Sequence, residues 1–424
     1  MKTNSEIVSP QAHLQQAFQQ IVDALGAHLP SSPEELPQLL QAGLTQLLTA
    51  TLQKERQFYL EDHPEDRANG YAPSRTVDVG ATPVSFERPR TRQGGFYPAV
   101  LPKHQRQLPQ AYQDLLQNIL LEAKSFAAAR RTLQALNLSY SPEQTEQLLQ
   151  QLYQEAQDFF SRPLATDWLV LFADAKVINL KDEHDQVKTA THFLVLGLDL
   201  QGQKHVLSVA TFWGHEALAA WRQVFIDLKN RGLTRVLLWV TDDFSGLTAL
   251  LQSLFPNSSH QLCTVHLLRN AQRQLNPQEY ATFKARWKEL CAASSPDSAR
   301  TQFLALLEIL RPANKAWVEH LQARTTQYLN FLQYPAALHP HLRSTNLPES
   351  LNNQIENLRR NAGGHFHTQR EALIKMKLLA DHLCQTKWHR TCPTIITHLA
   401  ALTGQFQKRF EAELDPQKFL TQNF

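Results

Sequence analysis

The stretch from Asp167 to Leu262 limits the possible folds more than any other part of the chain, because strand-like runs alternate there with one amphipathic helix. The runs "WLVLFADAKVINL", "THFLVLGLDLQGQKHVLSVATF" and "RVLLWVTDDFSGL" are rich in β-branched and aromatic residues and are separated by turn residues. The helix "EALAAWRQVFIDLKNRG" precedes the last run and ends at Gly232. The order strand, strand, strand, helix, strand, helix predicts an α/β sheet with mixed pairing.

Composition excludes several classes of protein. The chain has 424 residues, of which 42% are hydrophobic, enough for two or three domains with real cores. No apolar run approaches the ~20 residues of a membrane helix, and the first residues lack the apolar region of a secretory signal. Four cysteines give no disulfide framework, which fits a reducing compartment. We therefore expect a cytoplasmic protein.

The net charge of +3 does not by itself indicate a nucleic-acid partner, but the basic residues are unevenly distributed along the chain. Residues 88–113 contain no acid and combine five basic residues with Phe96, Tyr97, glycine and proline. Such a run is either a solvated surface or an extended segment that follows DNA phosphates. The candidate DNA-binding residues here are Arg88, Arg90, Arg92, Lys103 and Arg106.

The segments around this basic run are mainly helical in pattern. Residues 11–60 place Leu, Ile and Phe at three- and four-residue spacings, and residues 75–90 alternate as a small hairpin does. Residues 110–160 have the pattern helix, short turn, helix, with Pro142 at the first position of the second helix. This pair is either a helix-turn-helix that contacts DNA or ordinary helical packing.

Two acids follow buried strands, and a third begins a later helix. Asp174 follows "WLVLFA", Asp242 follows "RVLLWV", and Glu349 lies in "STNLPESLN". Three converging carboxylates repel one another unless cations neutralise them, and their oxygens suit Mg²⁺ or Mn²⁺. Two such ions are what two-metal phosphoryl transfer requires.

These motifs, with "LGLDLQGQKHVL", "DLKNRGL", "VTDDFSGL" and "FPNSSHQLCTVHLLRN", closely resemble the Mutator-type transposases of bacterial insertion sequences over most of residues 55–360. The resemblance implies a ribonuclease-H-like catalytic core with an Asp-Asp-Glu triad and an all-helical insertion before the glutamate. It assigns the triad, and the metal ligands, to Asp174, Asp242 and Glu349. Asp243 stands where the family usually has glycine. Because neighbours on a strand point to opposite faces, only one of the two adjacent aspartates can serve. We choose Asp242, because the family pattern of Asp, one residue, an aromatic or aliphatic residue, one residue and Gly-Leu is completed from it by Gly246-Leu247.

Cys263 and His266 match a Cys-x-x-His signature of the same family. Cys-x-x-His is half of a zinc site, but no second half lies nearby in the sequence, so a packed thiol beside an imidazole that supports the site or contacts DNA is favoured. A second grouping has metal-compatible residue types at a spacing that fits no zinc pattern: His382, Cys384, His389 and Cys392.

Glu349 and Glu356 lie seven residues apart on one expected helix, so they share a face and are separated by ~10 Å. We expect Asn346 or Leu347 to cap this helix, with Pro348 in its first turn and Glu349 at its positive end. Glu356 is expected to form an exposed ion pair with Arg359 and Arg360. Those arginines are alternatively candidates for phosphate contacts, as are Arg269 and Arg343.

The resulting prediction is a transposase that binds double-stranded DNA at the inverted repeats of its element and at the target. It is expected to act as a homodimer or larger homo-oligomer, without a membrane, in the bacterial cytoplasm at the nucleoid. The alternatives are a DNA-binding relative that does not transpose and a ribonuclease-H-like metal-dependent nuclease. We expect a helical region over 1–62, hairpin and basic segment over 63–109, helical DNA-binding or oligomerisation region over 110–165, core over 166–274, helical insertion over 275–338, and core with catalytic helix over 339–424.

Overall fold

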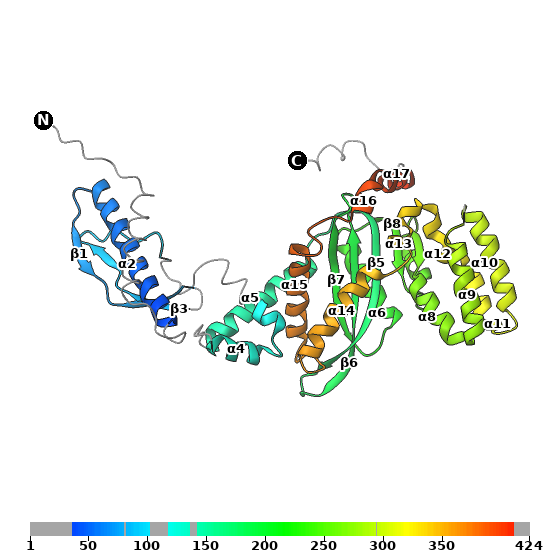
Figure 1. Cartoon of the computed structure of the whole chain (residues 1–424), viewed down its shortest axis with the longest axis horizontal. Coiled ribbons are helices and arrows are strands. Elements are labelled where there is room, and N and C mark those ends of the chain that lie inside the picture. Colours follow the sequence, from blue (N-terminus) through cyan, green and yellow to red (C-terminus); the bar gives the residue numbers. More distant parts are fainter. Residues whose placement is uncertain (1–35, 80–81, 102–117, 136–141, 294, 411–424) are drawn as a thin grey trace. The chain divides into compact units, whose positions relative to one another are not determined.

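The computed structural model describes residues 36–79, 82–101, 118–135, 142–293 and 295–410 (Figure 1). The chain divides into two compact units. The first comprises Met1–Leu120 and Phe126–Thr145, and the second comprises Leu121–Ser125 and Glu146–Phe424. Each unit is considered by itself below.

In the first unit, helix α2 (Leu36–Asp62) packs on an antiparallel hairpin of β2 (Arg75–Val79) and β3 (Thr82–Phe86), which confirms the predicted hairpin. A second antiparallel pair joins β1 (Ala68–Tyr71) to β4 (Pro89–Thr91). The hairpin and α2 share a small core in which Leu52 and Val84 are fully buried. The unit also contains α4 (Phe126–Ala135).

The second unit is built on a five-stranded sheet with the order β7-β6-β5-β8-β9. Strands β5 and β6 are antiparallel, as are β6 and β7, whereas β8 is parallel to both β5 and β9. The mixed pairing predicted from the strand and helix order is therefore confirmed. The strands are β5 (Asp167–Lys181), β6 (Val187–Leu198), β7 (Lys204–Trp213), β8 (Arg235–Thr241) and β9 (Ser259–Leu262).

Helices α6 (Leu218–Asn230) and α7 (Leu247–Leu254) cover one face of this sheet. Their core includes Ala173 of β5, with Ala175 packed against it. Asp174 lies between those two alanines and therefore points to the opposite face. On that face it meets α14 (Asn346–Asn361), a helix that contacts both β5 and β6.

The segment between β9 and α14 is helical and is longer at both ends than the insertion predicted over 275–338. It has an aromatic core of its own in which Phe283 and Phe303 flank Trp287. Its helices are α8 (Thr264–Gln274), α9 (Pro277–Leu290), α10 (Pro296–Leu310), α11 (Lys315–Ala323), α12 (Thr325–Leu329) and the short α13 (His339–Leu342). The remaining helices of the second unit are α15 (Gln369–Gln385), α16 (Pro393–Thr397), α17 (Leu399–Phe410) and, from Glu146 on, α5 (Pro142–Ser161).

Candidate active site

The register between β5 and β8 brings the first two acids together. The last paired residues of these parallel strands are Ala173 and Thr241. Asp174 is the next residue of β5, which continues beyond this pairing, and Asp242 is the first residue after β8; adjacent strands are ~4.8 Å apart. Two aspartates 68 positions apart in sequence thus become neighbours at the point where the pairing ends.

Burial is the main cause of the raised pKa of both aspartates, and the charge of Asp174 adds to the shift of Asp242. Burial is the largest cause that raises the pKa of Asp174 to about 7, and the charges of Glu349 and Glu216 act in the same direction. Burial also raises the pKa of Asp242 to about 8, with further contributions from Glu216, Asp174 and Asp243. Within the part of the chain that the structure describes, Asp242 Oδ1 is buried without a hydrogen-bond donor. A cation would relieve both the repulsion and this unpaired oxygen.

Asp243 is turned away from this pair toward the helical insertion. Its Oδ2 accepts from the Tyr328 hydroxyl at 2.9 Å and lies 2.5 Å from His320 Nε2, and its Oδ1 lies 3.0 Å from Arg324 Nε. Only 7% of the side chain is exposed. The Asp243 carboxylate is thus occupied by groups of the helical insertion, and the choice of Asp242 as the catalytic aspartate stays a prediction.

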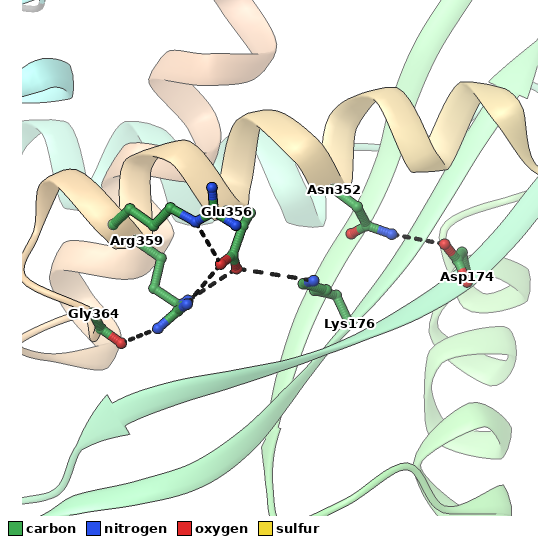
Figure 2. A network of polar contacts seen from close by, with 7 residues as sticks. Asp174, Lys176, Asn352, Glu356, Arg359 and Gly364 are labelled. Carbon is green, nitrogen blue, oxygen red and sulfur yellow. Dashed lines mark hydrogen bonds and ion pairs between the residues drawn. The ribbon is translucent and has the colours of Figure 1, made fainter.

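Helix α14 is fixed to β5 by two polar contacts one turn apart (Figure 2). Asn352 Nδ2 donates to Asp174 Oδ2 at 2.7 Å, and Lys176 Nζ lies 3.9 Å from Glu356 Oε2. Asp174 and Lys176 are two positions apart on the strand, and Asn352 and Glu356 are four apart on the helix, so each pair shares a face. The two contacts together set the register of the helix on the strand.

Glu349 lies in the first turn of α14, as expected, but the helix begins differently from the prediction. Thr345 is the residue before the first helical position, and no side chain caps the end. The Thr345 hydroxyl instead donates to Cys263 Sγ at 3.3 Å, so Asn346 and Leu347 are helical residues rather than caps. Glu349 Oε1 forms an ion pair with Arg269 Nη1 at 2.8 Å and lies 3.9 Å from His266 Nε2.

The Cys-x-x-His motif therefore lies beside the third acid. Cys263 is 1% exposed and accepts from both the amide and the hydroxyl of Thr345, while burial raises the pKa of its thiol. Burial has the opposite effect on His266: it lowers the pKa of the imidazole, and the charge of Arg269 lowers it further. A packed thiol that supports the site fits these contacts.

The expectation of an exposed ion pair at Glu356 is wrong in one respect. The pairing with Arg359 and Arg360 is present, but the Glu356 side chain is only 17% exposed because α14 lies on β5. Hydrogen bonds from Arg359 are the largest cause that lowers the pKa of Glu356 to about 2, and Arg360 and Lys176 contribute. Arg359 also donates to the Gly364 carbonyl, which ties the network to the end of the helix (Figure 2).

A fourth acid, Glu216, was missed by sequence reasoning. It lies between β7 and α6, and its Oε1 accepts from Nε1 of the fully buried Trp221 at 2.7 Å. Burial raises its pKa, and its charge acts on both Asp174 and Asp242. A Cβ on Gly246 would come within 2.7 Å of Leu218, so the start of α6 is packed against the loop that follows Asp242. The available sequence signal was an acid directly between a strand and a helix.

The donor set suits a hard cation, although no three His, Cys, Asp or Glu side chains in the described ranges lie close enough to hold a metal ion. Asp174 and Asp242 offer carboxylate oxygens where the pairing of β5 with β8 ends, and Glu349 is balanced by Arg269. Of the second metal-compatible grouping, His382, Cys384, His389 and Cys392, the last contacts His341, with 3.9 Å between Cys392 Sγ and His341 Nε2. These residues also form no cluster of three in the described ranges that could hold a metal ion.

The candidate DNA-binding residues have different surroundings. Arg90 and Arg92 are exposed, whereas Arg88 lies over the Tyr97 ring at 4.9 Å. Lys103 and Arg106 lie outside the described residues. In the second unit, Arg343 lies near the Cys291 thiol. The other three candidate arginines of this unit already have acidic partners. Those partners are Glu349 for Arg269 and Glu356 for Arg359 and Arg360.

The second unit is thus a mixed α/β unit in which Asp174 and Asp242 lie side by side where the pairing of β5 with β8 ends. Comparison with known proteins names the family: residues 11–390 match the Mutator family of transposases, and the chain belongs to that family.

Its relatives are transposases of insertion sequences. A probable transposase of an insertion sequence element from Corynebacterium diphtheriae is 28% identical over 284 residues, which cover 65% of this chain and 80% of that protein. The transposase of IS905 from Lactococcus lactis is 25% identical and covers 76% of this chain and 83% of its own length. The transposase of IS1081 from Mycobacterium tuberculosis is 24% identical, with 81% and 83% covered.

Among solved structures, the Drosophila P element transposase strand transfer complex aligns with 73% of this chain and 93% of that chain at 12% identity. Its TM-score of 0.27 does not establish a shared fold. None of the helices that the structure describes is both long and apolar enough to cross a membrane.

Proposed function

We propose that this chain is a DNA transposase that binds the ends of its insertion sequence and cleaves and joins DNA strands through Asp174, Asp242 and Glu349. The observation that carries the proposal is the register between β5 and β8, which makes Asp174 and Asp242 neighbours. The contact of Asn352 with Asp174 supports it, because it fixes the helix that bears Glu349 against the same strand.

A ribonuclease-H-like core is the fold we propose for the second unit. Three antiparallel strands continued by two parallel ones, with helices on both faces, support this assignment. The helices between β9 and α14 occupy the place of the insertion that the family resemblance implies.

Two Mg²⁺ or Mn²⁺ ions, when bound, would stabilise charge on the scissile phosphate and activate water or a 3′-hydroxyl for attack. Asp174, Asp242 and Glu349 would hold them. Asn352 orients Asp174 by donating to Oδ2, while the Ala175 amide donates to Oδ1 at 3.1 Å. Glu349 must exchange its ion pair with Arg269 to act as a ligand, and this exchange leaves Arg269 able to contact a DNA phosphate.

The expected partners follow from this activity. Arg90 and Arg92 of the first unit are exposed and able to contact phosphates at the element ends. Pairing two ends needs at least a dimer, so we propose a homo-oligomer that works at the bacterial nucleoid.

The test incubates the full chain with linear DNA carrying the element's own ends and a target plasmid, in Mg²⁺ and in Mn²⁺, and maps the products. We expect cleavage at the ends and joined strands, both lost in Asp242→Asn and Glu349→Gln. Cleavage at random sites without joining would identify a nuclease instead. Binding of the ends without any cleavage would identify a DNA-binding relative that does not transpose. Either result refutes the proposal.

A further inference from the structure

Asp243 has more polar partners than its neighbour Asp242, and all of them belong to the helical insertion. His320 lies on α11, Tyr328 on α12, and Arg324 at the junction between these helices. The three partners are spaced four residues apart, so they form one row along the insertion. The Tyr328 side chain is buried, and burial together with the charge of Asp243 raises its pKa, which keeps its hydroxyl a donor.

Asp242, in contrast, is held mainly through its backbone. Its Oδ1 has no hydrogen-bond donor in the described part of the chain. The preceding residue is fixed by strand pairing, and the Thr241 hydroxyl donates to the Asp242 carbonyl at 2.7 Å. The following residue is fixed by the three partners of the Asp243 side chain. The direction of the Asp242 carboxylate therefore depends on where the insertion holds Asp243.

We propose that Asp243 is a positioning residue, which couples the placement of α11 and α12 to the orientation of the catalytic Asp242. The proposal rests on the proposed function, because it assumes that Asp242 acts in strand cleavage. It is a feature of this chain's own sequence, since the resemblance places glycine at this position in the family, and glycine has no side chain to reach the insertion.

The chain offers a matched control for the attachment of the insertion. Gln261 of β9 is buried, donates to the Tyr328 carbonyl at 3.1 Å and accepts from the Phe331 amide at 2.7 Å. It holds the same part of the insertion to the sheet, but it does so from the strand beyond β8. Loss of Gln261 should loosen α12 without releasing Asp243 from His320 and Arg324.

The first test compares Asp243→Ala with Gln261→Leu in the full chain, at saturating DNA that carries the element ends. We expect Asp243→Ala to slow cleavage about 10- to 100-fold with unchanged affinity for the ends, because small misplacements of a catalytic group cost up to about 100-fold. Gln261→Leu should cleave within about threefold of wild type at equal or greater loss of thermal stability. Equal losses of activity in the two variants, or wild-type cleavage by folded Asp243→Ala, would overturn the proposal.

A pair of variants addresses the partner. Arg324→Gln should reproduce the slower cleavage. Adding Asp243→Asn to it should cause little further loss of activity, because both changes break the same contact between Asp243 and Arg324. Losses that multiply in the double variant would mean that the two residues act separately, and would contradict the coupling.

Hydrogen–deuterium exchange separates failure of this inference from failure of the proposed function, because it needs no catalysis. In Asp243→Ala, faster exchange is expected in residues 240–247 as well as in 315–329, whereas Gln261→Leu should affect 315–329 without 240–247. If the wild-type chain neither cleaves nor joins DNA but this exchange pattern holds, the proposed function fails and the coupling stands. If 240–247 is unchanged in Asp243→Ala, the coupling is refuted whatever the chain does to DNA.

Discussion

Replacing Glu356 by glutamine should destabilise the second unit in a way that depends on pH. The carboxylate accepts from Arg359 at 2.9 and 2.6 Å and from Arg360 at 3.1 Å, and it faces Lys176 at 3.9 Å. Glutamine keeps the size of the side chain but loses the charge. Because the network joins α14 to β5, the change weakens the attachment of the helix that carries Glu349.

The magnitude follows from the pKa of Glu356, which falls from 4.5 to about 2 in the folded chain. At about 1.4 kcal/mol per pKa unit, the upper limit is about 3–4 kcal/mol of folding free energy. Arg360 is 70% exposed and solvent screens its contribution, so we expect a loss of about 1–2 kcal/mol at pH 7. In a unit of this size that corresponds to a fall in Tm of about 2–8 °C.

The sign of the pH dependence is fixed by the lowered pKa. The stabilisation is complete above pH 4.5, where the unfolded chain is also ionised, and is lost as the pH falls toward 2. Under half of it, about 40%, should remain at pH 3. Urea unfolding of wild type and Glu356→Gln at pH 7, 5, 4 and 3 measures the difference directly. A difference that stays constant over this range would show that the charge of Glu356 is not its source.

Activity provides the control for this prediction. At 25 °C and pH 7, Glu356→Gln should retain most of its cleavage and joining, because the Asn352 contact with Asp174 still places α14 on β5. Glu349→Gln should show the opposite pattern, with almost unchanged stability and no activity. If both variants were equally inactive, the assignment of Glu349 as the catalytic glutamate would be untenable.

Three further predictions concern Asp174, Asp242 and Glu216. Asp242→Asn should be inactive, yet it should raise the free energy of unfolding of the metal-free chain at pH 8 by about 1–3 kcal/mol, because it removes a buried charge whose folded pKa is about 8. Calorimetry at pH 5 and pH 8 should show that this gain grows with pH. Mn²⁺ binding measured by titration calorimetry should weaken as the pH falls from 8 to 6, since Asp174 and Asp242 must lose protons to bind; a pH-independent affinity would argue against them as ligands. Glu216→Gln keeps the acceptor for Trp221 but removes a negative charge, so it should weaken Mn²⁺ binding about tenfold with an intact fold, and unchanged affinity would mean that Glu216 serves only α6.

The sheet and its two aspartates could be predicted from the sequence because their signals are local. Runs of β-branched and aromatic residues mark β5 and β8, and Asp242 directly follows β8 as predicted. The expectation that Asp174 ends its strand is wrong, because β5 continues to Lys181 through its pairing with β6. Alternation of side chains along a strand indicated that only one of Asp242 and Asp243 can serve, and the family pattern that ends at Gly246-Leu247 led to the choice of Asp242. What each aspartate contacts was beyond the sequence, since Tyr328 lies 85 residues from Asp243 and Asn352 lies 178 residues from Asp174.

The start of α14 illustrates why local rules failed elsewhere. Asn346 has the chemistry of a helix cap, and nothing nearby in the sequence argues against it. The helix begins one residue earlier than that rule predicts because Thr345 is held by Cys263, 82 residues away. The exposure of Glu356 was wrongly predicted for a similar reason. Its side chain is covered because α14 lies on β5, where Lys176 Nζ is 3.9 Å from Glu356 Oε2, and the sequence of its own helix does not show this.

Those same long-range contacts explain how a helical insertion can interrupt an active site without displacing its last residue. The insertion leaves the sheet after Cys263 and returns at Arg343, and the Thr264 amide donates to the Arg343 carbonyl at 2.8 Å. The hydrogen bond from Thr345 to Cys263 is a second contact between the two ends of the insertion. Both ends of the insertion are thus tied at one place, so the helices between them can vary in length while α14 keeps its starting point. The cysteine of the Cys-x-x-His motif then acts by fixing the start of the helix that presents Glu349, and His266 lies one turn further along α8, facing that glutamate.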